Sequence, residues 1–186
     1  RHTKKYSTRG DLGTIRIVNG LSISDRPPEV ADRAVPGHWE GDLISGSNNS
    51  HIATLVERNS RHTILAQLDG KDSDSVVQAI TRELIKLPLN SRKTLTWDRG
   101  MEMAKHASFT IATEMSVYFC DPQSPWKRGT NENTNRLLRQ YFPKKTPLNQ
   151  FTQDDLNKFA LELNERPRKT LGYQTPSEVI LNTVAM

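Results

Sequence analysis

The 186-residue sequence holds little cysteine, few aromatic residues and no long apolar run. Cys120 is its only cysteine, which excludes an internal disulfide or a cysteine-based zinc site and agrees with a reducing compartment. No window approaches the roughly 18 apolar residues of a membrane-spanning helix. Residues 1–20 are charged and lack the apolar core of a signal peptide. We therefore expect a cytoplasmic protein with no membrane partner. Because the sequence begins with Arg1 and not with Met, a longer parent protein stays open.

The chain is basic, with a formal net charge of +5 and a pI of about 9.4. Its cations gather in three groups, at residues 1–9, 127–145 and 166–169. Clustered Lys and Arg concentrate a positive field, which suits a polyanionic partner. A merely soluble basic protein fits the net charge equally well, so charge alone does not decide between them.

The hydrophobic pattern changes from strand-like to helix-like along the chain. Residues 1–35 show no sustained period, and we interpret them as a basic N-terminal arm or linker. The segments that follow predict an antiparallel meander and then helices alternating with strands, that is, an α/β fold with a mixed five-stranded sheet flanked by helices. The expected strands are 38–46, 51–58, 61–68, 92–97 and 116–121, and the expected helices are 72–87, 104–114, 130–142 and 152–164.

Three carboxylates take matching positions in this order of elements. Asp42 lies on the first strand, Asp98 directly follows the fourth, and Glu132 falls in the first turn of the helix after the fifth. If the first and fourth strands are neighbours, the two aspartates meet and the helix has only to deliver the glutamate. Clustered carboxylates repel one another unless cations bind them, and Mg²⁺ or Mn²⁺ prefers oxygen ligands. Two such ions about 4 Å apart suit an in-line phosphoryl displacement.

Each acid also has a structural interpretation. Asp98 precedes Arg99 and Gly100 and fits a turn, and Glu132 fits a helix start, where a carboxylate favours the helix dipole. Asp42 is harder to explain in this way, because a buried aspartate is rare unless it is paired. The conjunction of the three positions weighs more than any single one.

At these residues the chain closely resembles the DDE transposases of bacterial insertion sequences, in particular the family named after insertion sequence 30. The resemblance runs from about Pro36 to Glu178, and Asp98 and Glu132 are separated by 33 residues, as in the family. It rests on four segments, which read PGHWEGDLI, TLTWDRGMEMA, YFCDPQSPWKRGTNENTNRLLRQYFPK and LNERPRKTLGYQTPSEV.

The resemblance implies that residues 36–186 form an RNase H-like catalytic core, as in retroviral integrases, with a C-terminal helix and a basic tail. It implies that Asp42, Asp98 and Glu132 are catalytic and bind Mg²⁺ or Mn²⁺, two ions in all. It also implies cleavage of transposon ends, strand transfer into target DNA, assembly of a homo-oligomer on DNA, and a place in the bacterial cytoplasm at the nucleoid. Family members carry an N-terminal helix-turn-helix region, which residues 1–35 do not show.

Polar and basic residues near Glu132 are the candidates for DNA contact. Asn135, Arg136 and Arg139 follow it at helical spacing, and we expect them to share one exposed stripe with it. A solvated face, or an ion pair with Glu132, is the alternative for the two arginines. The remaining candidates are Lys127, Arg128, Arg166, Arg168 and Lys169, and the last three fit a solvated basic loop nearly as well.

Several further residues have two interpretations. His38 and Glu40 share a strand face with Asp42, where a supporting role and a purely structural one are both open. Glu102 lies one helical turn beyond Asp98 and could assist the site. Trp97 and Trp126 could stack on bases, although Trp97 at the end of a strand fits the core better.

Two other functions compete with transposition. A hydrolytic nuclease on the same fold would cut DNA but not join it. A truncated, non-catalytic modulator of a full-length transposase would bind DNA without cleaving it, but the presence of all three acids favours catalysis. The terminal-repeat sequence, the target preference and the oligomeric state cannot be predicted from the sequence.

Overall fold

The computed structural model describes residues 20–120 and 129–184, which form one six-stranded sheet of order β1-β6-β5-β2-β3-β4. On one side of the sheet, β2, β3 and β4 pair with their neighbours in antiparallel orientation. On the other side of β2, the strands β5, β6 and β1 pair with their neighbours in parallel orientation. The mixed sheet and the meander are therefore confirmed. The strands are β1 (Leu21–Ser22), β2 (His38–Ser45), β3 (His51–Glu57), β4 (Thr63–Gln67), β5 (Thr94–Trp97) and β6 (Ser116–Phe119).

Helices begin where the sequence provides capping side chains. Asp72 accepts a hydrogen bond from the backbone N–H of Ser75 at 3.0 Å, and Thr152 forms a capping box with Asp155. All four expected helices are present within a few residues of their predicted bounds. The helices are α1 (Glu29–Asp32), α2 (Ser73–Leu84), α3 (His106–Thr113), α4 (Gly129–Leu138), α5 (Gln153–Asn164) and α6 (Pro176–Val184).

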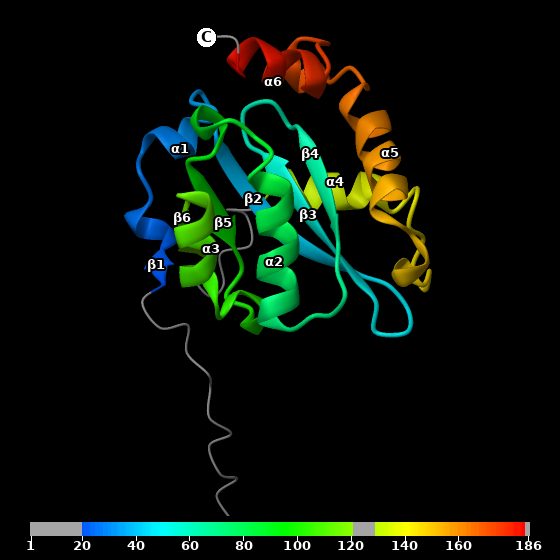
Figure 1. Cartoon of the computed structure of the whole chain (residues 1–186). Helices are drawn as coiled ribbons and strands as arrows, with labels where there is room; N and C mark the ends of the chain where they lie inside the picture. The colour runs from blue at the N-terminus through cyan, green and yellow to red at the C-terminus, as the bar shows by residue number, and fades with distance from the viewer. Residues whose placement is uncertain (1–19, 121–128, 185–186) are drawn as a thin grey trace, which may run out of the picture.

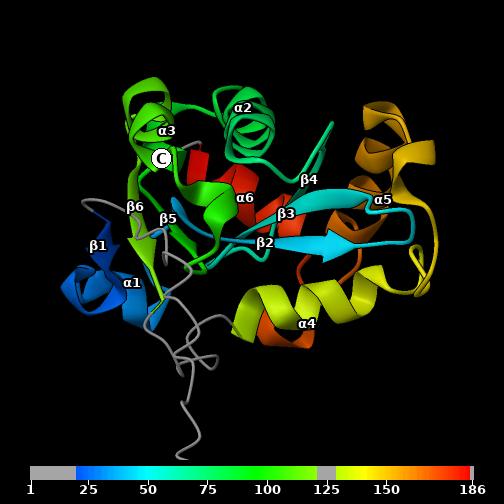
Figure 2. The same ribbon diagram turned by 90° about the horizontal axis from the view of Figure 1, so that it is seen from below.

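The helices cover both faces of the sheet. Figure 2 shows α2 and α3 on one face and α4 on the other, and Figure 1 shows α5 beside β4 and α6 across one end of the sheet. Each face has its own apolar core, and the alternation along β2 divides its side chains between them. Trp39 packs with α2 and α3, whereas Ile44 packs with the end of α4 and with α5. None of the described helices has the length and apolar character that a membrane crossing requires.

The prediction for the amino-terminal region was wrong in part. The sheet has six strands rather than five, because Leu21–Ser22 pairs in parallel with β6. A short helix, α1, follows, and Val30 within it is fully buried. A strand of two residues and a helix of four are too short to show a period, so the pattern of residues 20–35 resembled an irregular arm. The helix α6 was also not predicted as a separate element. The division of the chain at residue 35 stays a prediction.

Gly41 allows the aromatic core to close over β2. A Cβ atom at this position would overlap the six-membered ring of Trp97, whose side chain is almost fully buried against the strand. The missing side chain therefore lets β5 and β2 pack closely at the point where each leads into one of the predicted acids, Asp98 and Asp42.

We expect Gly41→Ala to destabilise the protein by about 1–3 kcal/mol, because Trp97 has no room to move within its packed core. Urea unfolding followed by circular dichroism measures this change. Gly129→Ala is the matched control, since a Cβ atom there meets nothing within 4 Å. Equal unfolding midpoints for the two variants would contradict the packing argument.

Candidate active site

The two aspartates are on neighbouring strands. β2 and β5 pair in parallel, with His38 opposite Thr94 and Glu40 opposite Thr96. Continuing this register by two residues brings Asp42 level with Asp98, which directly follows β5. Adjacent strands lie about 4.8 Å apart, so the two residues start from neighbouring backbone positions. The two strands are therefore neighbours, which is the condition under which the two aspartates were expected to meet.

The carboxylate of Asp42 is directed toward α4. Its Oδ1 accepts a hydrogen bond from the backbone N–H of Leu43 at 2.8 Å, and its Oδ2 accepts one from Nδ2 of Asn135 at 3.0 Å. The side chain is half-buried, whereas Asp98 is exposed. Asp42 is therefore held between its own strand and the helix that carries Glu132.

Asn131 fixes the start of α4 on the sheet. It is 1% exposed, and its side-chain amide donates to the backbone carbonyls of Glu40 and Thr54, at 3.2 and 3.4 Å. Its Oδ1 accepts a hydrogen bond from the Thr54 hydroxyl at 3.0 Å, and that hydroxyl also approaches the backbone carbonyl of Asp42. The residue next to Glu132 is thereby bound to β2, which carries Asp42, and to the neighbouring strand β3.

A buried ion pair completes this attachment. Glu40 is fully buried, pairs with Arg58, and accepts a hydrogen bond from the backbone N–H of Asn131 at 3.0 Å. Burial lowers the pKa of Arg58 to about 10, and the negative charge of Glu40 opposes this shift. Arg26 donates to Thr96 at 3.2 Å on the next strand. Glu40 is thus a structural partner of α4, and a supporting role beside Asp42 stays a prediction.

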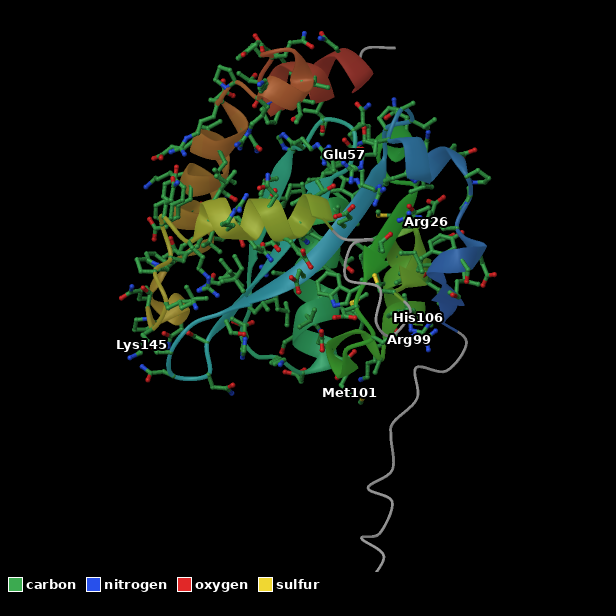
Figure 3. The ribbon with its side chains drawn as sticks, turned by 180° about the vertical axis from the view of Figure 1, so that it is seen from behind. Arg26, Glu57, Arg99, Met101, His106 and Lys145 are labelled. Atoms are coloured by element: carbon green, nitrogen blue, oxygen red, sulfur yellow. The ribbon has the colours of Figure 1, made fainter. Side chains whose placement is uncertain are left out.

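The helix α4 covers the face of the sheet opposite to the one that α2 and α3 cover. Figure 3 looks onto this face, with Arg26 and Glu57 labelled toward the amino-terminal end of α4 and Lys145 toward the opposite end.

His38 has a structural contact with the neighbouring strand β5, since its Nδ1 lies 2.8 Å from the Thr94 hydroxyl. Burial, and after it the charges of Lys93 and Arg58, lower the pKa of His38 to about 4, so that it is neutral at pH 7.

Glu132 is exposed in the first turn of α4, between the two residues that bind β2. Across residues 20–120 and 129–184, no group of three or more His, Cys, Asp or Glu side chains lies close enough together to hold a metal ion. The convergence of the three acids on one metal site therefore stays a prediction.

The oxygen donors that are present do fit a hard divalent cation. Asp42 and Asp98 supply carboxylates from adjacent strands, and Oδ1 of Asn135 is buried beside Asp42 with no hydrogen-bond partner within the described part of the chain. Carboxylate and amide oxygens are the ligands that Mg²⁺ and Mn²⁺ prefer.

The stripe predicted on α4 is only partly exposed. Glu132 and Arg136 face solvent, and Arg136 donates to Asn133 at 2.8 Å. Asn135 instead faces Asp42, and Arg139 donates from both terminal nitrogens to the backbone carbonyl of Ser45 at 3.3 Å. The prediction of one common exposed stripe was wrong, because α4 lies flat on β2 and turns two of the four side chains toward it.

The other predicted DNA-contacting residues are spread over the chain. Arg166 lies over the ring of Tyr141 at 5.6 Å, Arg168 donates to the backbone carbonyl of Leu163 at 3.0 Å, and Lys169 is exposed. Lys127 and Arg128 lie outside the described residues.

The remaining candidates from the sequence are Glu102, Trp97 and Trp126. Glu102 accepts a hydrogen bond from the indole of Trp97 at 3.3 Å, and Trp97 belongs to the apolar core, as the structural interpretation had it. Trp126 lies outside the described residues.

The fold is that of the RNase H-like catalytic cores of retroviral integrases. The structure matches the catalytic core domain of BIV integrase with a TM-score of 0.59 and 20% identity, over 79% of this chain and 95% of that one. It matches a chain of the simian T-cell lymphotropic virus intasome in complex with PP2A regulatory subunit B56 gamma, with a TM-score of 0.61 and 18% identity, over 77% of this chain and 54% of that one.

The chain belongs to the integrase core domain family, whose model matches residues 32–125. Its sequence is 59% identical over its full length to the transposase InsI for insertion sequence element IS30A of Escherichia coli (strain K12), of which it covers 49%. It is 50% identical, over 96% of its length and 53% of the relative's, to the transposase for insertion sequence element IS1086 of Cupriavidus metallidurans. The chain thus spans about half the length of these curated relatives.

We expect Asn131→Ala to lower the free energy of unfolding by about 1–3 kcal/mol, because it leaves buried polar groups of β2 and β3 without partners. Urea titration monitored by fluorescence measures the loss. Asn133→Ala is the control from the same helix turn, since Asn133 is exposed and contacts Arg136. If both variants unfold at the same urea concentration, Asn131 does not hold α4.

Proposed function

We propose that this chain contains the catalytic core of a DNA transposase, which cleaves DNA at transposon ends and transfers the freed ends into target DNA. The observation that carries the proposal is the parallel register of β2 and β5, which sets Asp42 level with Asp98 while α4 is bound alongside. The similarity to insertion-sequence transposases supports it.

In the proposed reaction, the oxygen of a water molecule attacks a phosphodiester at the transposon end, and the P–O3′ bond breaks to free a 3′-hydroxyl. That 3′-hydroxyl then attacks a target phosphodiester, so that one P–O bond forms as another breaks. Neither step needs a protein nucleophile, which agrees with Cys120, the only cysteine, being 3% exposed.

Asp42, Asp98 and Glu132 would hold Mg²⁺ or Mn²⁺, two ions in all. When bound, such ions lower the pKa of the attacking water and stabilise the leaving oxygen. Nδ2 of Asn135 orients Asp42 through its Oδ2, and the contacts of Asn131 keep the first turn of α4 beside β2. These two asparagines are therefore positioning residues for the acids.

DNA is the proposed partner, and exposed cations such as Arg136 and Lys169 are proposed to contact its backbone, together with Lys127 and Arg128. Asn135, Arg139 and Arg166 would extend less far from the protein surface toward the DNA, because each already contacts a neighbouring element of the fold. We also propose that the protein acts as a homo-oligomer on DNA, in the bacterial cytoplasm at the nucleoid, as pairing of two transposon ends calls for at least two copies.

We expect Asp42→Asn, Asp98→Asn and Glu132→Gln each to reduce nicking and joining by a factor on the order of 10³, because each removes a charge at the reacting phosphate. The assay incubates a 5′-labelled duplex carrying the end of the source element with supercoiled plasmid and Mg²⁺ or Mn²⁺. Gel electrophoresis separates nicked from joined products.

Glu102→Gln is the matched control, since it changes one nearby carboxylate whose contact is with the Trp97 indole. It should retain full activity. Nicking without joining would favour a hydrolytic nuclease on the same fold. Equal activity in wild type and in all three acid variants would refute the assignment of the site.

A further inference from the structure

A concave site lies along α4, on a different side from the contacts of Asn131 and Asn135 with β2. It has a volume of about 310 Å³, and three arginines from distant parts of the sequence line it. Arg33 precedes β2, Arg61 lies in the turn between β3 and β4, and Arg168 follows α5. The other lining residues are Gly129, Thr130, Asn133, Thr134, Leu137 and Thr170.

The helix α4 therefore has three distinct sides. Asn131 and Asn135 bind β2, Glu132 and Arg136 face solvent, and a third row lines the cavity. The members of this row follow the i, i+3, i+4, i+7 spacing of one helix face, and they are Thr130, Asn133, Thr134 and Leu137.

The wall of the cavity carries the positive charge of its three arginines. No carboxylate occurs among the described residues that line it. Burial, followed by the charge of Arg33, lowers the pKa of Arg61, and the charges of Glu40 and Glu57 oppose this shift. Glu57 itself is already engaged by donors, since it accepts hydrogen bonds from the backbone N–H groups of Gly37 and Ser60.

Burial also lowers the pKa of Arg168, and the charge of Arg166 adds to this shift. Its Nε is buried with no hydrogen-bond partner within the described part of the chain. Gathering cations in a half-enclosed space costs free energy, and a bound anion offsets that cost. The wall also provides hydroxyl groups, and Arg61 is already oriented by a 2.7 Å hydrogen bond to the hydroxyl of Thr130.

We propose that Arg33, Arg61 and Arg168 form a phosphate-binding pocket that takes a backbone phosphate of DNA. Planar guanidinium groups match the oxygens of a phosphate in pairs, and a pocket with three of them selects an anion with several oxygens. The proposal deepens the proposed function and rests on it, because DNA is the polyanion that reaches α4. A phosphate held there would fix the strand relative to Glu132, which lies on the adjacent side of the same helix turn.

The first test measures binding of a fluorescein-labelled duplex by anisotropy in EDTA, so that no metal and no chemistry are needed. Arg33→Gln and Arg61→Gln should each weaken binding about tenfold, as expected for a lost charge-assisted hydrogen bond. Each should also reduce the slope of log K against log salt by about 0.9 between about 50 and 200 mM salt. Arg33→Lys, which keeps the charge but not the fork, should bind with intermediate affinity.

Arg82→Gln is the matched control, because Arg82 is a half-exposed arginine on α2, which covers the opposite face of the sheet. It should leave affinity and salt slope unchanged. Arg61→Gln also removes the bond to Thr130, so Arg33→Gln is the second variant that separates binding from folding. Circular dichroism verifies the fold of every variant.

The second test separates DNA from free phosphate, with inorganic phosphate as the probe in a thermal-unfolding experiment. Loss of DNA affinity in both Gln variants supports the pocket as a site for backbone phosphate. Loss of stabilisation by inorganic phosphate with unchanged DNA affinity would overturn DNA as its source. No change in either measurement would overturn the pocket. A chain that binds DNA through these arginines but never nicks it would contradict the proposed function alone.

Discussion

The attachment of α4 to β2 is the interaction on which the candidate site depends. Two of the three acids come from strands that pair in the sheet, but Glu132 comes from a helix that could lie anywhere over it. Asn131 and the buried carboxylate of Glu40 determine where that helix begins. The Arg58 charge balances Glu40, so that a buried acid is tolerated beneath the site. A buried ion pair is often no more stabilising than apolar residues of similar volume. Here the Glu40 carboxylate also accepts the backbone N–H of Asn131 and so holds the start of α4.

Polar contacts on one side of α4 and apolar contacts at its end have different consequences. Leu138 packs into the apolar core with α5, which holds the helix against the sheet without fixing its rotation. The hydrogen bonds of Asn131 and Asn135 fix that rotation, because each amide reaches β2 at one register. The same rotation directs Thr130 and Thr134 toward the three arginines. One helix orientation therefore serves the acids, the exposed cations and the arginine-lined cavity together.

Much of this arrangement could be predicted from the sequence. The strands and helices of residues 38–164 follow from their periods and caps, and so do the positions of Asp42 on β2, Asp98 directly after β5 and Glu132 in the first turn of α4. The contacts of Asn131 and Glu40 were missed, because α4 buries the polar residues Thr130, Asn131 and Thr134, where an apolar pattern is sought. The arginine cluster was missed because Arg33, Arg61 and Arg168 are far apart in the sequence and only the fold brings them together. The strand β1 was too short to show any period.

In the proposed site, a helix held by the amides of Asn131 and Asn135 delivers Glu132 to the carboxylates of Asp42 and Asp98. Anomalous diffraction from crystals grown with Mn²⁺ tests this claim most directly, because it locates the metal independently of catalysis. We expect an anomalous peak between Asp42 and Asp98, within about 2–2.5 Å of their carboxylate oxygens, with Glu132 turned toward it. Peaks that lie elsewhere, or the absence of any peak at these carboxylates at saturating Mn²⁺, would contradict it.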